Sequence, residues 1–544
     1  MAFLFSVLVL KEKEFAFISV KRILILFCII FFVGKNSIAQ NPNIIWQKCY
    51  GGSGSESANA MIATSDGGYL IVGNTDSNDG DISFNHGGSE DVWLLKIDSN
   101  GVKDWEKSYG GSGSESVYSI IETEHKCYLI FGTTDSNDGD VSNNHGHNDL
   151  WLVKIDSVGT IIWGKTFGGS EYDDGEYFQQ TLDNGFILVG ATNSIDGDIG
   201  AGFGHGGGDC LILKVDSAGM IQWKKIIGGS ESDFLTSICT TSDGGYAVFG
   251  NSRSDDFDII TNQGWSDYLI IKLDSTGTVE RLKTYGGTSM DVAIQGSIIQ
   301  KEDGGFLVSG STASNNGNVS NNHGNYDFWI LSLNNAGAIQ WQKCFGGSNS
   351  DLPYSKILKT NAGNYALAGS TSSNDGQVNN LHMSTPECWL IFFNSSVDLL
   401  PTSAQCFGGN QGDFGSSVLQ CANGDYLIAG GTGSDDGDVS GNHNSNTGDI
   451  WVFKLSQSVG IKEVNNGTTV TVYPNPAANQ LTVESTKTIN TIEITDAIGR
   501  VQSFKLKVQR PATQIDIHAL ASGIYFIKLY FGDGSFVVKK FIKE

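Results

Sequence analysis

The chain has 544 residues, of which 70 are glycine and only 7 are proline, and aromatic residues make up 10%. This composition favours many short strands joined by tight turns over helices or disorder, so we expect an all-β protein. The formal net charge is -25, and both ends of the chain are net basic, which concentrates the acidity in the middle. So acidic a surface repels phosphate backbones, which excludes nucleic acid as a partner.

Residues 1–39 have the pattern of an N-terminal extension followed by a signal peptide. Lys21 and Arg22 precede the apolar run ILILFCIIFFVG, and Ser37-Ile-Ala forms a small-residue cleavage site before Gln40. A transmembrane anchor is the alternative, but this apolar run is too short to span a bilayer. We therefore expect export, a mature chain that begins near Gln40 and carries no transmembrane helix, and a true translation start that lies either at Met1 or at Val20.

Eight of the nine cysteines follow the predicted cleavage site. An even number in an oxidising compartment permits disulfides. Cys388 and Cys406 are candidates for facing each other on adjacent strands, whereas burial as unpaired small apolar residues is the alternative for most of the others.

A Gly-Gly pair that follows an aromatic or apolar residue recurs at intervals of 58 to 62 residues. The seven pairs begin at Gly51, Gly110, Gly168, Gly228, Gly286, Gly346 and Gly408. In the first unit the pair is followed by a polar loop, a strand (ANAMIAT), a Ser-Asp-Gly-Gly turn, a strand (YLIVGNT), a long acidic loop, a strand (VWLLKID), a Ser-Asn-Gly turn and a strand (VKDWEKSY). Four antiparallel strands in each of seven repeats predict a β-propeller over residues 40–458.

The last repeat has three strands but lacks a fourth one that ends in Gly-Gly. The missing strand is present at the other end of the repeat region as IIWQKCYGG, residues 44–52. We expect this N-terminal strand to complete the seventh blade and to remove the exposed edge that an open array would present. A straight solenoid is the alternative, and the offset argues against it.

Tryptophan recurs at two positions of the repeat, where it is expected to pack one blade against the next. The fourth strand contains Trp46, Trp105, Trp163, Trp223 and Trp341, and the third strand contains Trp93, Trp151, Trp329, Trp389 and Trp451. Arg281 and Ser403 interrupt the first series. Units of this form (GGSGSES...DGGYLIVGNT), over residues 44–457, resemble the bacterial seven-bladed β-propeller repeat (SBBP-like) family, which implies a fold but no particular activity.

The acidic loop of each repeat has the oxygen-rich composition that calcium prefers, with a glycine for a sharp turn. The candidate calcium ligands are Asp76, Asp79, Asp81, Asp135, Asp138, Asp140, Asp436 and Asp438. The glycine is out of register for an EF-hand, and the fifth repeat (SNNGNVS) has no carboxylate. Turn-forming Asx residues that bond to the backbone are therefore the alternative to calcium, and we expect no other cofactor.

A histidine occupies the same loop position in six repeats, and an acidic residue follows it four to six positions later. The pairs are His86/Asp91, His145/Asp149, His205/Asp209, His323/Asp327, His382/Glu387 and His443/Asp449. Because six equivalent copies around a ring cannot converge on one catalytic centre, we expect each pair to form a hydrogen bond that ties the loop to its blade. The fourth repeat has Gln263 there, which suits hydrogen bonding and not metal ligation.

No G-x-S-x-G elbow, H-E-x-x-H helix or P-loop is present in the sequence. The segment DSNGVKDW is similar to the D-x-x-G-x-x-x-W pattern of quinone-dependent propeller dehydrogenases. Here the pattern is only the third turn of the repeat followed by the packing tryptophan, so we disfavour such an enzyme. A glycosidase needs two carboxylates across a pocket, and the repeats offer too many candidates to choose from. The most irregular loops, residues 252–265 with Trp265 and residues 381–389, are where we expect a site.

From residue 468 the acidic, glycine-rich loops stop and a smaller β module begins, after a linker at 459–467. By pattern alone it is a small Ig-like β-sandwich in which Gly499 marks a hairpin turn. The module resembles the type A C-terminal sorting domain of the type IX secretion system of Bacteroidetes. The resemblance rests on Asp496 to Arg500, Lys539 to Lys543, Tyr473, Pro474, Asn475, Pro476, Gly523 and Tyr525. It implies export by the Sec route and handling by the type IX machinery, whereas an ordinary adhesive sandwich is the alternative.

The leading hypothesis is a secreted or cell-surface propeller that binds an extracellular glycan or protein through its loop-rich acidic face. A secreted hydrolase that acts on polysaccharide or peptide is the alternative. An enzyme should show one or two repeats that depart from the pattern to form a pocket, whereas a binding protein can use the ring uniformly.

Overall fold

The computed structural model describes residues 43–544, except 124–125, 202–203, 379–380, 383–385, 395–398, 445–446, 457–469, 497–500 and 533–535. The described residues form strands β1 to β34 and no α-helix, so the protein is all-β as predicted. Residues 41–458 form one compact unit, and residues 459–544 belong to another. The predicted signal peptide and linker lie outside the described residues, and none of the described segments is a helix of the length and apolarity that a bilayer crossing requires.

Residues 41–458 form seven antiparallel sheets, each of which pairs its strands in chain order except at the ring closure. The first sheet contains β2 (Glu56–Ala63), β3 (Tyr69–Thr75), β4 (Asp91–Ile97) and β5 (Lys103–Tyr109). The following sheets contain β6 (Glu115–Glu122), β7 (Tyr128–Thr134), β8 (Asp149–Ile155) and β9 (Ile161–Phe167); β10 (Asp173–Gln180), β11 (Phe186–Thr192), β12 (Asp209–Val215) and β13 (Ile221–Ile227); and β14 (Asp233–Thr240), β15 (Tyr246–Ser252), β16 (Asp267–Leu273) and β17 (Val279–Tyr285). The fifth and sixth contain β18 (Asp291–Gln300), β19 (Phe306–Thr312), β20 (Asp327–Leu333) and β21 (Ile339–Phe345); and β22 (Asp351–Pro353), β23 (Leu358–Lys359), β24 (Tyr365–Thr371), β25 (Glu387–Phe393) and β26 (Leu399–Phe407).

The seventh sheet contains β27 (Asp413–Gln420), β28 (Tyr426–Thr432), β29 (Asp449–Leu455) and, as its outermost strand, β1 (Ile44–Tyr50). Cys49 of β1 lies opposite Trp451 of β29, and Tyr50 lies opposite Ile450. The predicted pairing of the N-terminal strand with the last repeat is therefore confirmed. Because the two ends of the repeat region share one sheet, β29 has no unpaired edge.

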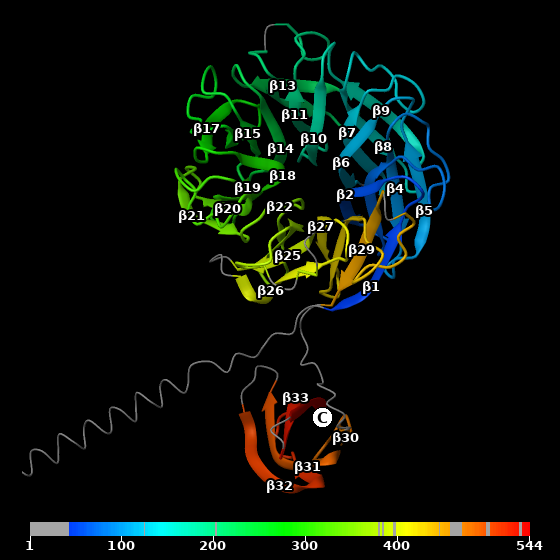
Figure 1. Ribbon diagram of the computed structural model, residues 1–544, viewed down its shortest axis with the longest axis vertical. Helices are drawn as coiled ribbons and strands as arrows, with labels where there is room; N and C mark the ends of the chain where they lie inside the picture. The colour runs from blue at the N-terminus through cyan, green and yellow to red at the C-terminus, as the bar shows by residue number, and fades with distance from the viewer. Residues whose placement is uncertain are drawn as a thin grey trace, which may run out of the picture. The chain divides into compact units, whose positions relative to one another are not determined.

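The seven sheets follow one another around a ring (Figure 1). The first strand of each repeat lies on the inner side, at β2, β6, β10, β14, β18, β22 and β27, and the fourth strand lies on the outer side. Successive residues of the second and third strands point to opposite neighbours, as strand periodicity requires. Ile71, for example, packs with Leu427 of the seventh sheet, whereas Leu70 packs with Ile130 of the second. The core is therefore a series of apolar layers between neighbouring sheets.

The recurring tryptophans lie within these layers. Trp93, Trp329, Trp389 and Trp451 of the third strand are fully buried. The fourth-strand tryptophans are half-buried, and Trp46 lies against Gly101, in the turn that follows β4. The predicted packing role of both series is confirmed.

The prediction that Cys388 and Cys406 face each other is wrong. In the β25–β26 pair, Cys388 lies opposite Phe407, and Cys406 lies opposite Trp389. The one-residue offset places the two thiols on opposite faces of the sheet, because successive side chains alternate. All eight cysteines of the described residues are free thiols.

The C-terminal unit is one five-stranded antiparallel sheet. It contains β30 (Val470–Tyr473), β31 (Gln480–Asp496), β32 (Val501–Asp516), β33 (Gly523–Phe531) and β34 (Phe536–Lys543). The long strand β31 pairs with β30, β32 and β33, and β34 adds to β33. Ile492, Ile527 and Phe541 are among the residues of its separate apolar core. The predicted turn at Gly499 lies outside the described residues.

Candidate functional site

The acidic loop of each repeat is bonded to the Gly-Gly loop that opens the same repeat. Asp79 Oδ1 accepts a hydrogen bond from the backbone N–H of Ser53 at 2.7 Å, and Asp138 Oδ1 accepts one from Ser112 at the same distance. The equivalent bond recurs in all seven repeats, and in the fifth repeat Asn316 makes it to Thr288. The amide oxygen of Asn316 accepts this hydrogen bond as the carboxylate oxygens do. The bond between the two loops therefore needs no negative charge.

The other predicted calcium ligands also contact backbone groups. Asp76 and Asp135 accept hydrogen bonds from the N–H groups of Ser55 and Ser114. Asp81, Asp140 and Asp438 contact the N–H of the first glycine of their repeat at 3.3 to 3.4 Å, and Asp436 accepts from Asn410 at 2.8 Å. Within the described ranges, no three His, Cys, Asp or Glu side chains gather in an arrangement that would hold a metal ion. This geometry favours the Asx alternative, although the bonds tie one loop to another and not a loop to itself.

A second set of acidic residues, which the sequence did not single out, begins the first strand of every repeat. The set consists of Glu56, Glu115, Asp173, Asp233, Asp291, Asp351 and Asp413, and none is more than 3% exposed. Glu56 accepts hydrogen bonds from Gly52 N at 2.9 Å and from Thr75 Oγ1 at 2.7 Å. The signal that was available is the fixed spacing of the acid after each Gly-Gly pair.

Each of these carboxylates lies beside the buried acid that begins the third strand of the preceding repeat. A Cβ atom on Gly51 would lie 2.5 Å from Glu56 Oε2 and 2.6 Å from Asp449 Oδ1, so both oxygens converge on this glycine. In six of the third-strand acids the Oδ1 atom is buried and has no hydrogen-bond partner among the described residues: Asp91, Asp149, Asp209, Asp267, Asp327 and Asp449. Burial raises the pKa of these carboxyls, and a proton on the unpartnered oxygen would relieve the repulsion within each pair.

The histidines lie where the sequence predicted, and five of the six bond to their acid. The Nδ1 atoms of His86, His145 and His443 lie 3.1, 2.6 and 2.6 Å from the carboxylates of Asp91, Asp149 and Asp449, and His323 and His382 make the same bond. His205 is the exception, because only its backbone N–H bonds to Asp209. The hydrogen-bonding role is therefore confirmed for the other five.

The second ring nitrogen of three histidines points to the acidic loop of the next repeat. His86 Nε2 lies 3.2 Å from Asp140, and the corresponding distances from His145 to Asp198 and from His443 to Asp81 are both 3.9 Å. The histidine thus bridges neighbouring sheets through two carboxylates. In the fourth repeat Gln263 takes this place and bonds to Asn318 at 3.1 Å, so both members of the bridge are replaced by amides.

The ring departs from its repeat on the inner strands of the fifth and sixth sheets. In the sixth repeat the inner strand is divided into β22 and β23, and Ser355 Oγ accepts the hydrogen bond of Ala368 N at 2.8 Å, which compensates for the interrupted pairing. In the fifth repeat β18 carries two extra residues, and Gln295 has a φ of +48°. Neither of the two cavities described below is lined by residues 252–265 or 381–389, of which 383–385 lie outside the described residues, and Trp265 is 77% exposed.

The divided strand places Lys356 in the centre of the ring. Its Nζ donates hydrogen bonds to the carbonyl oxygens of Thr236, at 3.0 Å, and Gly296, at 2.7 Å. It also lies 4.4 Å from the centre of the Tyr177 ring, within the range of a cation–π interaction. Burial lowers the pKa of Lys356 to about 7, although the charge of Glu176 acts in the opposite direction.

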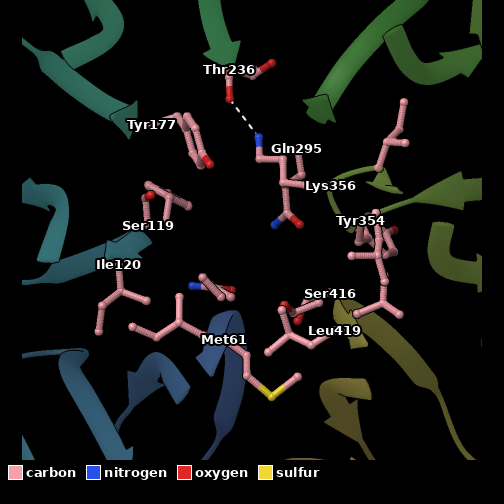
Figure 2. Close-up of a pocket in the computed structure, with 18 of the residues that line it drawn as sticks. Met61, Ser119, Ile120, Tyr177, Thr236, Gln295, Tyr354, Lys356, Ser416 and Leu419 are labelled. Carbon is pink, nitrogen blue, oxygen red and sulfur yellow. Dashed lines mark hydrogen bonds between the residues drawn. The ribbon is translucent and has the colours of Figure 1, made fainter. Parts of the chain in front are cut away.

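We call the cavity around these residues the channel pocket. It has a volume of about 240 Å³ and is lined by inner-strand residues from all seven repeats: Asn59–Ile62, Tyr118–Ile120, Glu176, Tyr177, Thr236, Gln295, Tyr354, Lys356–Leu358 and Ser416–Leu419. Figure 2 shows Lys356, Tyr177, Gln295 and Thr236 on one side of the pocket, and Met61, Ile120 and Leu419 on the other. The pocket therefore has a charged end at Lys356 and an opposite end that contains these apolar residues together with Ser119 and Ser416.

A larger and more open hollow of about 680 Å³ lies among turns of the third and fourth repeats. Its most polar feature is the ion pair of Lys214 with Asp183 at 2.9 Å. The same pair recurs as Lys96 with Asp66 and as Lys272 with Asp243, so it belongs to the repeat. The channel pocket, whose charged groups occur once in the ring, is the better candidate for a specific site.

In the C-terminal unit, Asn475 of the predicted sorting motif bonds the start of the domain to its last strand, and the other motif residues make contacts within the sheet. Asn475 accepts a hydrogen bond from Ile542 N at 2.9 Å, and Tyr525 donates to the Ala521 carbonyl at 2.9 Å. Tyr473 donates to Glu484 at 2.6 Å, and Gly523 lies opposite Lys543. Pro474 and Pro476 lie in the bend between β30 and β31. The motif therefore has a structural role within the domain.

Comparison with known proteins gives one family and several distant relatives. Residues 471–544 match the model of the secretion system C-terminal sorting domain. The regulatory protein FlaEY of Caulobacter vibrioides is 22% identical over 396 residues, which cover 66% of this chain and 41% of FlaEY.

Two solved structures are similar at low sequence identity. The extracellular domain of the hybrid two component system BT4673 from B. thetaiotaomicron is 12% identical, with a TM-score of 0.40 over 92% of this chain and 60% of that one. The Pan2 WD40 domain of Neurospora crassa is 9% identical, with a TM-score of 0.38 over 74% of this chain and 97% of that one. The chain spans less than two thirds of FlaEY and of the BT4673 domain.

Residues 471–544 are a type IX secretion system C-terminal sorting domain, and the protein is therefore secreted or located at the cell surface.

Proposed function

We propose that the protein is a secreted or cell-surface binding protein whose seven sheets are the blades of a seven-bladed β-propeller, closed by the N-terminal strand. The propeller comprises residues 40–458, and the domain at residues 468–544, whose single five-stranded sheet would have to fold over itself to form the Ig-like β-sandwich, directs the chain to the type IX machinery. The channel pocket carries this proposal, because its charged and aromatic groups depart from an otherwise regular ring and converge on one cavity. Concave sites with a few convergent polar groups are where small ligands usually bind.

The lining of the channel pocket supports binding over hydrolysis. Glu176 is the only carboxylate among its described lining residues, which include no histidine and no cysteine. A glycosidase needs two carboxylates. A hydrolase with a nucleophile needs a base bonded to it, and among the described residues no hydroxyl group bonds to the side chain of Lys356 or Glu176. Lys356 and Glu176 provide one donor and one acceptor, which suffice for recognition.

A thermal-shift screen of the full chain tests this function. The library contains neutral sugars, amino acids, short peptides and nucleosides, and a ligand of the folded state should raise the melting temperature. The stabilisation should be lost in Lys356→Gln and kept in Lys359→Gln, which makes the same charge change at a half-exposed side chain near the pocket. If no compound class shifts the melt, or if every hit also stabilises Lys356→Gln, the proposed function is wrong.

The eight predicted calcium ligands are proposed sites of a different kind, on the loops. A melt of the full chain with calcium and then with chelator tests them directly. A higher melting temperature with calcium would identify ion sites, because a ligand stabilises the state that it binds. An unchanged melt would leave these carboxylates as anchors for the backbone N–H groups of the Gly-Gly loops.

A further inference from the structure

Glu176 and Lys356 are opposite charges that line the same cavity without forming an ion pair. Each affects the pKa of the other, so their charges interact. No ion pair within 4.0 Å joins them, and Glu176 accepts no hydrogen bond from the described residues. Opposite charges that lie near each other and remain apart leave a gap that a ligand with both charges can bridge.

Lys356 has one N–H group left for a ligand. An ammonium has three donors, and two of them bond to the carbonyls of Thr236 and Gly296. These two bonds and the ring of Tyr177 fix the position of the nitrogen. The remaining donor suits a carboxylate, because charge-assisted hydrogen bonds are the stronger kind.

Glu176 offers both of its oxygens to a ligand cation. Burial raises its pKa to about 7, and the nearby charge of Asp174 acts in the same direction, whereas that of Lys356 acts against it. A bound ammonium would restore the charged form. The rings of Tyr118 and Tyr177 line the same cavity and are available for a cation–π contact.

The apolar end of the channel pocket sets the third requirement. Met61, Ile120 and Leu419 line the cavity at the end away from Lys356 (Figure 2), and Met61 and Ile120, each 4% exposed, also belong to the apolar layers between neighbouring sheets. A cavity of about 240 Å³ corresponds to about eight water molecules at ~30 Å³ each, so a ligand with roughly that number of non-hydrogen atoms would fill it. A zwitterionic head group with a short aliphatic side chain satisfies all three requirements.

We propose that the channel pocket binds a free apolar α-amino acid, with its carboxylate on Lys356, its ammonium on Glu176 and its side chain against Met61, Ile120 and Leu419. The inference rests on the proposed binding function and names the ligand class of that site. L-leucine and L-methionine are of the required size and character.

Isothermal titration calorimetry of the full chain with L-leucine tests the inference. The comparison ligands are isoamylamine, which lacks the carboxylate, 4-methylpentanoic acid, which lacks the amine, and glycine, which lacks the side chain. We expect L-leucine to bind at least tenfold more tightly than each of the three. Equal affinity for L-leucine and any one of them would overturn the assignment of the corresponding contact, and with it the amino-acid proposal.

The decisive variant is Glu176→Gln, because Glu176 makes no hydrogen bond to the described residues whose loss would disturb the fold. We expect its affinity for L-leucine to fall at least tenfold, while Glu231→Gln, an exposed glutamate on the loop that precedes β14, keeps the affinity of the unchanged protein. Unchanged affinity in Glu176→Gln would refute the inference. If sugars or nucleosides stabilise the protein through Lys356 and L-leucine does not, the amino-acid inference fails while the binding function stands.

Discussion

The pair of Asp267 and Asp291 provides the sharpest test of how the ring manages its buried acids. Asp267 is fully buried, and the only hydrogen bond that its carboxylate accepts from the described residues comes from Gln263 N, at 2.8 Å, on the Oδ2 atom. Its Oδ1 atom has no partner among those residues and converges with Asp291 on Gly286. Burial, with the adjacent charge of Asp291, raises the pKa of Asp267 to about 7. The substitution Asp267→Asn keeps the shape of the side chain and removes its titration.

The magnitude follows from the pKa values of the folded and unfolded states. Asp267 has a pKa of about 7 in the folded protein and an ordinary value of 3.8. An acid whose pKa is raised by folding contributes stability that is fully present below 3.8 and is lost as the pH rises to about 7. At about 1.36 kcal/mol for each pH unit in that range, the loss is about 4 kcal/mol. An asparagine side chain does not titrate, so Asp267→Asn should not show this loss.

The assay is urea unfolding of the full chain and of Asp267→Asn at pH 5, 6, 7 and 8. We expect the variant to be less stable than, or equal to, the unchanged protein at pH 5, and to become progressively the more stable of the two toward pH 8. Gln263→His is the matched variant, since a histidine there should bond to Asp267 as His323 bonds to Asp327. That bond lowers the pKa of Asp267 and should flatten the pH dependence. A difference in stability between Asp267→Asn and the unchanged protein that stays constant from pH 5 to pH 8 would refute the reasoning.

Three further outcomes are expected. Gly80→Ala should lower the free energy of unfolding by about 1–3 kcal/mol in urea, because Gly80 has a φ of +66° and a Cβ there would overlap the Gly51 carbonyl. Gly67→Ala, where φ is +88° but the space around the residue is open, should lower the free energy of unfolding by less. Equal losses of stability in the two variants would contradict this steric account. Deleting residues 43–50 should expose the edge of β29, lower the melting temperature and promote self-association, which light scattering detects. A variant that stays monomeric and keeps the melting temperature of the unchanged protein would show that closure of the ring by β1 does not stabilise it. Removing residues 468–544 should leave the chain in the periplasm, and its continued appearance outside the cell would contradict the sorting role.

The sequence by itself determined the features that depend on local spacing. A fixed order of strands and turns in each repeat predicted the seven sheets, and the missing fourth strand predicted that the N-terminal strand pairs with β29. The hydrogen bonds between histidines and acids were also predictable, because the two residues lie four to six positions apart on one loop. His205 is the exception, and its segment differs from the others in that Gly204 precedes it where an asparagine precedes His86, His145, His323 and His443.

Only the tertiary structure decided which residues of different repeats meet. The buried carboxylate pairs join the first strand of one repeat to the third strand of the preceding one, so each acid appears in the sequence as an ordinary member of a polar loop. Lys356 and Glu176 come from the sixth and third repeats and line the same cavity because the ring brings all inner strands around one channel. Strand periodicity predicts which side chains share a face. It does not predict where the inner strand of the sixth sheet is divided, or which residues of other repeats the residues at that division contact. That depends on the closure of the ring, which is a property of the whole chain.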